Sequence, residues 1–271
     1  MQKILLAGTN LSFSRIGFGT AALHHLGSRA DRERLVHAAL DHGITHFDTS
    51  PYYGHGLAEI ALAGLGRAAT IATKVGLYPP GGAHGSHTRM LLRKGLGKLL
   101  HSLSRPEVDF AVERARRSLH DSLRRLKRER VELLLLHEPR SELVATDEWR
   151  RWLAADRDRI GAIGVAGEFA RIWPFVHSGS ELAAVIQTGA TLSAQDFAAL
   201  SGVRRSAQIT YGHLAGRNVE VPISKTLGAA LASFPEAVLL LGTRRIERLA
   251  EFARAAAAAA VAPQGAVHQP A

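Results

Sequence analysis

Four side chains that could carry out acid–base chemistry lie at the ends of short apolar runs or just after them. Asp48 ends HFD, Lys74 ends TIATK, His137 ends VELLLLH, and Tyr53 follows Asp48 by five positions in FDTSPYYG. Reduction of a carbonyl by hydride needs a proton donor, and a free phenol with a pKa of about 10 is a poor one near neutral pH. An ammonium group beside the Tyr53 hydroxyl would lower the pKa of that phenol. Asp48 would hold Lys74 charged, and His137 would hydrogen-bond the carbonyl oxygen.

Each of these residues also has a purely structural explanation. Asp48 could cap a turn, Lys74 could extend its amine to the rim, His137 could be a hydrogen-bonded core histidine, and Tyr53 could simply pack. Singly, the structural explanation is favoured for each of them. An acid, an ammonium, an imidazole and a phenol at the mouth of one fold are hard to assign to stability, so the set favours chemistry.

The elements that must position these residues follow a repeating pattern. Short apolar runs alternate with amphipathic segments, which is typical of strand–helix units around a parallel sheet. Eight runs in about 250 residues predict a (β/α)₈ TIM barrel, with its active site at the C-terminal ends of the strands. The predicted strands are Arg15–Gly19, His46–Asp48, Thr70–Lys74, Leu133–His137, Ala162–Ala166, Ala184–Thr188, Ser206–Tyr211 and Ala237–Leu241.

Other segments have simpler signatures. Helices are predicted at Asp31–His42, Asp109–Leu126 and Ile246–Ala260. A short N-terminal hairpin with a turn near Gly8–Asn10 is expected to plug the barrel floor. The Gly-, Pro- and His-rich segment Gly76–Thr88 follows the third strand, so it is expected to be a loop, with the role of a lid or substrate loop. Residues 1–261 are predicted to form one barrel domain, and residues 262–271 a disordered tail.

Composition narrows the class of protein. The 271 residues are 46% hydrophobic and 21% charged, which is typical of a soluble globular chain. There are no cysteines, which excludes disulfides, thiolate metal sites and cysteine nucleophiles. The N-terminal apolar run is too short for a signal peptide, and no stretch approaches the roughly 20 apolar residues of a spanning helix. We therefore expect a cytoplasmic protein without membrane insertion and without a metal site.

The net charge of +10 at pH 7 has two interpretations. Much of the basic charge lies in residues 89–130, where clustered Arg and Lys alternate with apolar residues at helical spacing. Such a stretch could bind an anionic surface or an acidic partner. The alternative, a solvated helix face, is the favoured interpretation. No nucleic-acid module signature accompanies the charge, so nucleic acid is not an expected partner.

The order and spacing of these motifs resemble the aldo-keto reductase superfamily along nearly the whole chain. GFGTAALH from Gly17 resembles that family's first-strand motif, FDTSPYYGHGLAE from Phe47 its second, and IATKVG its lysine strand; ERARRSLHDSLRRLKRERVELLLLHEP resembles its helix leading to the catalytic histidine. The resemblance implies a catalytic tetrad of Asp48, Tyr53, Lys74 and His137. Within the superfamily, GTAAL and DTSPYYG are most similar to a sugar-dehydrogenase branch, of which this chain would be a short member. GFGT lacks the third glycine of a doubly wound dinucleotide fingerprint.

The resemblance also implies a nicotinamide cofactor. Gln187 is similar to the residue that holds the nicotinamide amide, and Tyr211 to the aromatic that stacks on the ring. Leu239–Phe252 resembles the segment that binds the adenosine phosphate. Three arginines and a threonine near a helix start favour NADP(H) over NAD(H), because guanidinium groups and helix amides attract a phosphate. The implied cofactor-binding set is Gly19, Thr20, Gln187, Tyr211, Gly212, Leu214, Gly242, Thr243, Arg244 and Arg248.

The chain departs from the family pattern on the cofactor side. Ala166 and Gly167 stand where many members have Ser-Asn, which removes two side chains that hydrogen-bond the carboxamide, and Phe252 stands where many have Asn near the adenine. The loops expected to build a substrate pocket include His24, His25, Tyr52, His55 and Trp149 or Trp152.

Three classes of function are therefore open. The leading hypothesis is an NADP(H)-dependent oxidoreductase that interconverts an aldehyde, ketone or aldose and its alcohol or lactone, with Tyr53 as general acid and base. The alternatives are a non-catalytic cofactor-binding regulator on the same barrel, and a partner-docking protein that uses the basic stretch. We expect a small carbonyl or sugar substrate and a monomer or weak homo-oligomer.

Overall fold

The computed structural model describes most of the chain. Of the predicted features, the tail at 262–271 and the first part of the basic stretch lie outside the described residues. The described residues are 1–83, 85–86, 106–217 and 220–261.

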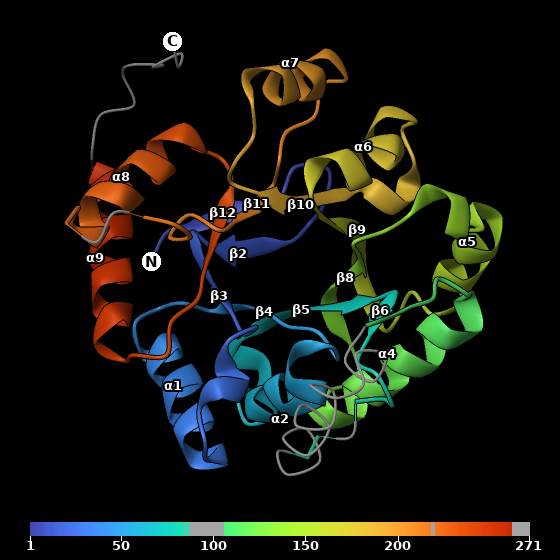
Figure 1. Ribbon diagram of the computed structural model, residues 1–271, viewed down its shortest axis with the longest axis horizontal. Coiled ribbons are helices and arrows are strands. Elements are labelled where there is room, and N and C mark those ends of the chain that lie inside the picture. Colours follow the sequence, from blue (N-terminus) through green and yellow to red (C-terminus); the bar gives the residue numbers. More distant parts are fainter. Residues whose placement is uncertain (84, 87–105, 218–219, 262–271) are drawn as a thin grey trace, which may run out of the picture.

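Eight parallel strands close into a barrel, as the alternating pattern predicted, and the helices surround it (Figure 1). Each strand pairs with the next one along the ring, and the last pairs back with the first. In ring order the strands are β3 (Ile16–Gly19), β4 (His46–Asp48), β5 (Thr70–Val75), β8 (Val131–His137), β9 (Ile160–Gly167), β10 (Val185–Gly189), β11 (Ile209–Tyr211) and β12 (Val238–Leu241).

The apolar run before His137 explains why β8 is buried on both faces. Leu133 and Leu135 pack into the barrel interior, whereas Leu134 and Leu136 pack against the surrounding helices. Side chains alternate between the two faces of a strand, so a strand with no polar face must be covered on both sides. This burial places His137 at the end of a rigid strand.

Serine side chains cap the N-terminal ends of two helices. Ser28 caps the first helix by accepting the Asp31 amide, and Ser193 forms a capping box with Asp196. The α-helices are α1 (Arg29–Asp41), α2 (Leu57–Leu62), α4 (Val112–Leu126), α5 (Thr146–Ala155), α6 (Phe169–His177), α7 (Ala194–Gly202), α8 (Ile223–Ser233) and α9 (Glu247–Val261). Short 3₁₀ turns are η1 (Leu23–His25), η2 (Tyr53–Gly56), η3 (Gly66–Ala68), η5 (Ser141–Leu143) and η6 (Glu181–Ala183).

The predicted N-terminal hairpin is present and plugs the barrel. Its strands β1 (Lys3–Leu5) and β2 (Ser12–Ser14) pair antiparallel. Ile4, Leu6 and Phe13 pack with the interior apolar cluster of the barrel, and Phe13 stacks on His46 with ring centroids 3.8 Å apart. Because His46 is the first residue of β4, the plug covers the N-terminal ends of the strands, opposite the expected active site.

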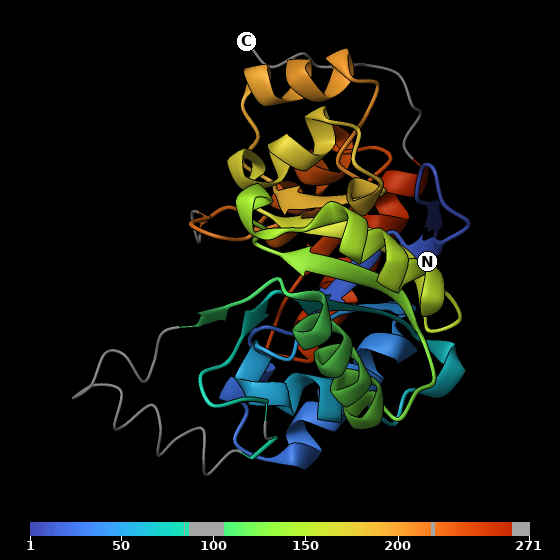
Figure 2. The ribbon, with the colours of Figure 1, turned by 90° about the vertical axis from the view of Figure 1, so that its right-hand side faces the viewer.

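The segment after β5 is not an irregular loop throughout, contrary to the prediction for Gly76–Thr88. Leu77–Tyr78 forms strand β6, which pairs antiparallel with β7 (Glu107–Val108). Further along, the Gly85 amide donates to the His55 carbonyl at 2.7 Å. Figure 2 places this strand pair on the side of the barrel away from the N-terminal hairpin. The described part of the segment is therefore held by the β6–β7 pairing and by the Gly85 hydrogen bond.

The described part of the basic stretch forms α4, whose apolar side packs into the core through Ala115, Leu119 and Leu126. On its exposed side, arginines form ion pairs with neighbouring acids: Arg114 with Glu107, Arg116 with Glu113 and Arg124 with Asp121. This arrangement favours the interpretation of a solvated helix face over that of an anionic-surface site.

Candidate active site

Asp48 and Lys74 form a buried ion pair at the mouth of the barrel. They end or nearly end the neighbouring strands β4 and β5, which pair in parallel with Asp48 opposite Ala72. Lys74 Nζ donates to Asp48 Oδ1 at 2.5 Å and to the Thr49 carbonyl at 3.0 Å. The lysine and aspartate side chains are 1% and 4% exposed. Burial lowers the pKa of Lys74, and Asp48 opposes that shift.

The end of β4 is fixed by its neighbour in the barrel. The Thr20 amide and hydroxyl both donate to the Asp48 carbonyl, at 3.0 Å and 2.9 Å. Thr20 is fully buried and is not on the pocket wall. Thr20 therefore holds the Asp48 backbone in place, and its predicted part in cofactor binding stays a prediction.

Tyr53 opens the short turn η2, which follows β4. Gly54 lies in the left-handed region at φ +60°, and a Cβ there would come within 2.4 Å of the His24 Cβ, so the turn requires glycine. The Tyr53 ring lies 5.0 Å from Lys74 Nζ and meets the His137 ring edge-on, with centroids 5.8 Å apart. The structure thus brings the four predicted catalytic residues together.

The electrostatics around these rings differ from the prediction in one respect. Burial raises the pKa of Tyr53 well above its usual value, and the charges of Asp48 and Glu138 raise it further. Lys74 donates its hydrogen bonds to Asp48 and Thr49, and no donation to the Tyr53 hydroxyl is among its contacts with the described residues. Burial, and then Lys74, lowers the pKa of His137 well below its usual value, so this imidazole is neutral near pH 7.

A pocket of about 330 Å³ lies over these residues. It is lined by the four predicted catalytic residues, by most of the predicted cofactor residues on the nearby strand ends, and by several residues that sequence reasoning did not select. The lining residues are Gly19, Ala21, Ala22, Asp48, Tyr53, Lys74, His137, Glu138, Ala166, Gly167, Gln187, Tyr211, Gly212, Leu240 and Gly242.

The pocket suits a nicotinamide ring. Gln187 is 3% exposed; its Nε2 donates to Asp48 Oδ2 at 3.2 Å, and its Oε1 is buried without a hydrogen-bond partner among the described residues. A buried acceptor without a protein donor is available to an N–H group of a bound ligand. Tyr211 offers an aromatic face, while Gly212 at φ +89° and Gly242 add no side-chain bulk. The residues present therefore fit the ring and its carboxamide.

The remaining predicted cofactor residues lie away from the pocket wall. Leu214 packs against the core. The Thr243 hydroxyl accepts from the Arg245 amide at 3.0 Å and donates to the Arg245 carbonyl at 3.3 Å, so it shapes the turn into α9. Arg244 is exposed and Arg248 half-buried, and neither side chain forms an ion pair with a residue that the structure describes. In the sequence, both residues come shortly after Gly242, which does line the pocket.

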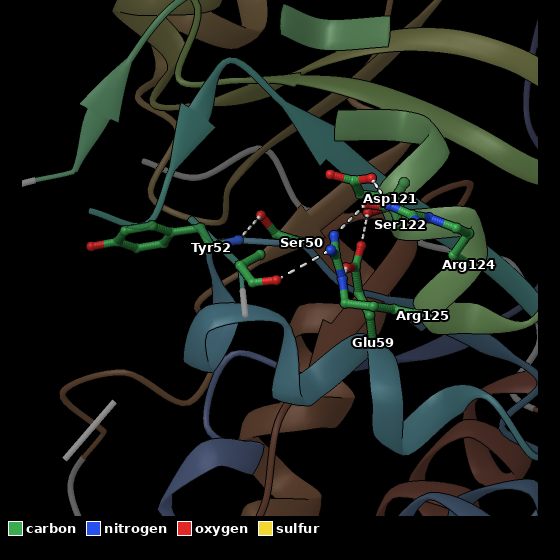
Figure 3. A network of polar contacts seen from close by, with 9 residues as sticks. Ser50, Tyr52, Glu59, Asp121, Ser122, Arg124 and Arg125 are labelled. Atoms are coloured by element: carbon green, nitrogen blue, oxygen red, sulfur yellow. Dashed lines mark hydrogen bonds and ion pairs between the residues drawn. The ribbon is translucent and has the colours of Figure 1, made fainter. Parts of the chain in front are cut away.

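A second polar network joins β5, α2 and α4 next to the site (Figure 3). Glu59 of α2 is fully buried and accepts from Thr73 Oγ1 and from Arg125 Nε, both at 2.7 Å. Arg125 of α4 also donates to Ser122 Oγ at 3.1 Å and to the Ala83 carbonyl at 3.3 Å. Because Thr73 precedes Lys74 and α2 follows η2, the network ties together the segments that carry Lys74 and Tyr53.

Glu138 was not among the predicted site residues, and two tryptophans were wrongly expected to line the substrate pocket. Glu138 lines the pocket directly after His137. The rule that selected His137, a polar residue ending an apolar run, would have found its neighbour too. Trp149 and Trp152 are 0% and 5% exposed, and their indole N–H groups bond to Phe110 and Asp156. The expectation that either lines a substrate pocket is wrong, because both pack in the core.

Neither a metal-ligating cluster nor a membrane-spanning helix is found among the described residues. There is no cluster of three or more metal-ligating side chains among them. None of the described helices is both long enough and apolar enough to cross a bilayer.

Comparisons with known proteins agree with this geometry. The pyridoxal 4-dehydrogenase of Microbacterium luteolum is 31% identical over 159 residues, which are 51% of this chain and 43% of that protein. The L-galactose dehydrogenase of Arabidopsis thaliana is 33% identical over 144 residues, which are 49% of this chain and 37% of that protein. The matched part therefore spans less than half the length of either relative.

Solved structures share the fold over almost the whole chain. The glycerol dehydrogenase of Gluconobacter oxydans has a TM-score of 0.69 at 20% identity, covering 93% of this chain and 89% of its own. An aldo-keto reductase of Klebsiella pneumoniae in complex with NADPH has a TM-score of 0.66 at 19% identity, covering 95% and 90%. The sequence model of the Aldo/keto reductase family matches residues 15–175, more than half of the chain and all four predicted catalytic residues. The chain belongs to the aldo/keto reductase family.

Proposed function

We propose that this protein is an NADP(H)-dependent oxidoreductase that interconverts an aldehyde, ketone or aldose and its alcohol or lactone. The observation that carries the proposal is the convergence of the Asp48–Lys74 ion pair, Tyr53 and His137 on one pocket. A nicotinamide cofactor, when bound, gives or takes the hydride.

Tyr53 is the proton donor in reduction and the proton acceptor in oxidation. Burial raises the pKa of the Tyr53 phenol, so the free protein holds it protonated near pH 7, which is the form that reduction requires. Lys74 lies 5.0 Å from the ring centroid, and its charge favours the phenolate that remains once the proton has moved. Asp48 keeps Lys74 charged in a buried place, where an unpaired ammonium would lose its proton.

His137 positions the substrate. Because its pKa is lowered well below the usual value, the neutral ring donates a single N–H. That N–H is suited to hydrogen-bond the carbonyl oxygen and to stabilise the negative charge that develops there. Its ring is 5.8 Å from that of Tyr53, so one oxygen atom can lie within reach of both groups.

Gln187 and Tyr211 would hold the nicotinamide, and the segment from Gly242 to Arg248 would hold the adenosine end. Preference for the phosphorylated cofactor follows from Arg244 and Arg248, whose side chains have no ion-pair partner among the described residues. An NADPH complex is also present among proteins of similar fold. We further propose a cytoplasmic location, consistent with a chain without cysteine, and a monomer or weak homo-oligomer.

The test is a fluorescence titration with NADPH and NADH, followed by a panel of carbonyls, alcohols and aldoses under both oxidation states. We expect binding, and turnover of at least one polar carbonyl or aldose. Binding without any turnover would favour the non-catalytic regulator, whereas no binding of either dinucleotide would exclude both functions.

A further inference from the structure

Glu138 occupies an unusual backbone position at the pocket wall. Its φ is +49°, in the left-handed region, and its amide donates to the Ala166 carbonyl at 2.7 Å. Non-glycine residues in this region are uncommon and mark places where function or packing fixes the backbone. Glu138, the residue that follows β8, therefore lies beside the end of β9 and lines the pocket.

Gly167 makes room for that carboxylate. A Cβ on Gly167 would lie 2.8 Å from Glu138 Oε2, closer than carbon and oxygen atoms approach without displacement. The same oxygen accepts from the Glu168 amide at 3.4 Å and pairs with Arg171 Nε at 3.4 Å. Within the described part of the chain, no hydrogen bond reaches the other carboxylate oxygen, Oε1. Glu138 thus presents one held oxygen and one available acceptor.

Gln187 approaches the same place from the opposite side. In the barrel register, His137 of β8 and Gln187 of β10 both pair with Ala166 of β9. Two strands that flank a common neighbour are about 10 Å apart. The strand between them ends in Ala166 and Gly167, which contribute only a methyl group and a hydrogen to the pocket wall between Glu138 and Gln187.

A hydrogen bond from Nε2 sets the orientation of the Gln187 amide. Its Nε2 donates to Asp48, which leaves Oε1 as the buried acceptor that has no partner among described residues. The pocket therefore contains two side-chain acceptors, on strands that flank the same small-residue strand end. A primary amide carries two N–H donors on one nitrogen, and hydrogen bonds of about 2.9 Å to two acceptors would satisfy both.

We propose that Glu138 and Gln187 together bind the amide NH₂ of the nicotinamide carboxamide, Glu138 through Oε1 and Gln187 through its Oε1. The inference rests on the proposed function, since it requires the nicotinamide to bind in this pocket. Glu138 is then a cofactor-binding residue that takes over the recognition for which Ala166 and Gly167 have no polar side chain. A carboxylate is a stronger acceptor than a neutral amide oxygen, so Glu138 is the larger contributor.

The test measures binding of NADP⁺ and of its 3-acetylpyridine analogue by titration calorimetry, without turnover. The analogue replaces the amide NH₂ by a methyl group and so removes both donors. We expect the unmodified protein to bind NADP⁺ at least tenfold more tightly than the analogue. Glu138→Met should reduce that ratio by about tenfold, mainly by weakening NADP⁺. Glu138→Gln, which keeps one acceptor oxygen, should retain an intermediate ratio.

Glu168→Met is the matched control, because Glu168 is an exposed carboxylate nearby and its removal should leave the ratio unchanged. Equal affinity of the unmodified protein for the two dinucleotides would overturn the inference, as would an unchanged ratio in both Glu138 variants. If no dinucleotide binds to the unmodified protein, the proposed function fails as well. If NADP⁺ binds but no more tightly than the analogue, this inference fails and the proposed function stands.

Discussion

Asp48 and Lys74 lie on the first half of the barrel mouth, formed by β3, β4, β5 and β8, and both are held by hydrogen bonds from other parts of the chain. Arg244 and Arg248 follow β12 on the second half, and their side chains form no ion pair with any residue that the structure describes. Proton transfer needs the same geometry in every turnover, so the protein fixes it in advance. In the proposed cofactor site, Arg244 and Arg248 would gain a charged partner only when the ligand phosphate binds.

The largest effect should come from Tyr53, the proposed proton donor on the first half of the mouth. Tyr53→Phe removes the hydroxyl but keeps the ring, so turnover should fall by about 10² to 10⁴-fold, the usual contribution of general acid catalysis. Affinity for the cofactor, measured by fluorescence titration, should stay almost unchanged. Tyr52→Phe is the matched control, because it removes a neighbouring phenol that is not on the pocket wall. A loss below about tenfold in Tyr53→Phe would contradict the assignment.

Removal of the Glu59–Arg125 ion pair should lower the stability of the protein. Arg125→Met leaves the fully buried Glu59 carboxylate without its ion-pair partner. Removing one partner of a buried pair lowers the free energy of unfolding by about 3 to 5 kcal/mol, which urea denaturation would measure.

Arg124→Met is the control for that substitution, because Arg124 directly precedes Arg125 in α4 (Figure 3). The Arg124 side chain is 80% exposed. Its effect on the unfolding midpoint should be small. Equal effects of the two variants would mean that the Glu59–Arg125 pair does not hold the site.

Acid should destabilise the barrel through His46. Burial lowers the pKa of His46 from 6.5 to about 3, so below pH 6.5 the unfolded chain takes up a proton that the folded chain does not. Stability is therefore complete above pH 6.5 and declines as the pH falls towards 3. At pH 5 the loss is about 2 kcal/mol for this group, at about 1.4 kcal/mol per pH unit.

The measurement is the free energy of unfolding between pH 5 and pH 8. His46→Gln should flatten the profile, and the exposed control His120→Gln should not. An unchanged slope in His46→Gln would show that His46 is protonated in the folded protein or that other groups carry the dependence.

The same comparison explains what could be predicted from the sequence. The barrel and the convergence of Asp48, Tyr53, Lys74 and His137 on one pocket were predictable, because each residue lies at or near the end of an apolar run and the ends of parallel strands converge at one face. The predicted strand at Ser206–Tyr211 begins instead at Ile209. Gln208 lies just before this strand, and its side chain bonds the Ile186 amide and the Ala7 carbonyl, so it connects the strand to the N-terminal hairpin.

Long-range contacts account for the rest. The hydrogen bonds from Thr20 to Asp48 and the Glu59–Arg125 pair join residues 28 and 66 positions apart, which no local pattern contains. The pairing of β6 with β7 was missed for the same reason, because β7 lies about 30 residues further along the chain. The position of Glu138 depends on the absence of a side chain at Gly167, on a different strand.

The second half of the mouth contains the features expected of a phosphate site that is completed by its ligand. Gly242 lines the pocket at the end of β12, and α9 begins five residues later at Glu247. Arg245 pairs with Glu247, whereas Arg244 and Arg248 do not pair with any described acid. The Thr243 hydroxyl is bonded within its own turn, so it holds the turn in shape and is not a ready donor.

Arg248→Ala should therefore give the smallest of these effects, and a selective one. A hydrogen bond to a charged group contributes about 1.5 to 3 kcal/mol, so loss of this contact should weaken NADPH binding by about tenfold and leave NADH almost unaffected. Arg254→Ala, an exposed arginine further along α9, is the control and should change neither affinity. Raising the salt concentration should reduce the NADPH preference of the unmodified protein, because an exposed charge pair is screened. Equal affinity of the unmodified protein for NADPH and NADH would contradict the proposed phosphate site. It would not bear on the proposed proton transfer by Tyr53.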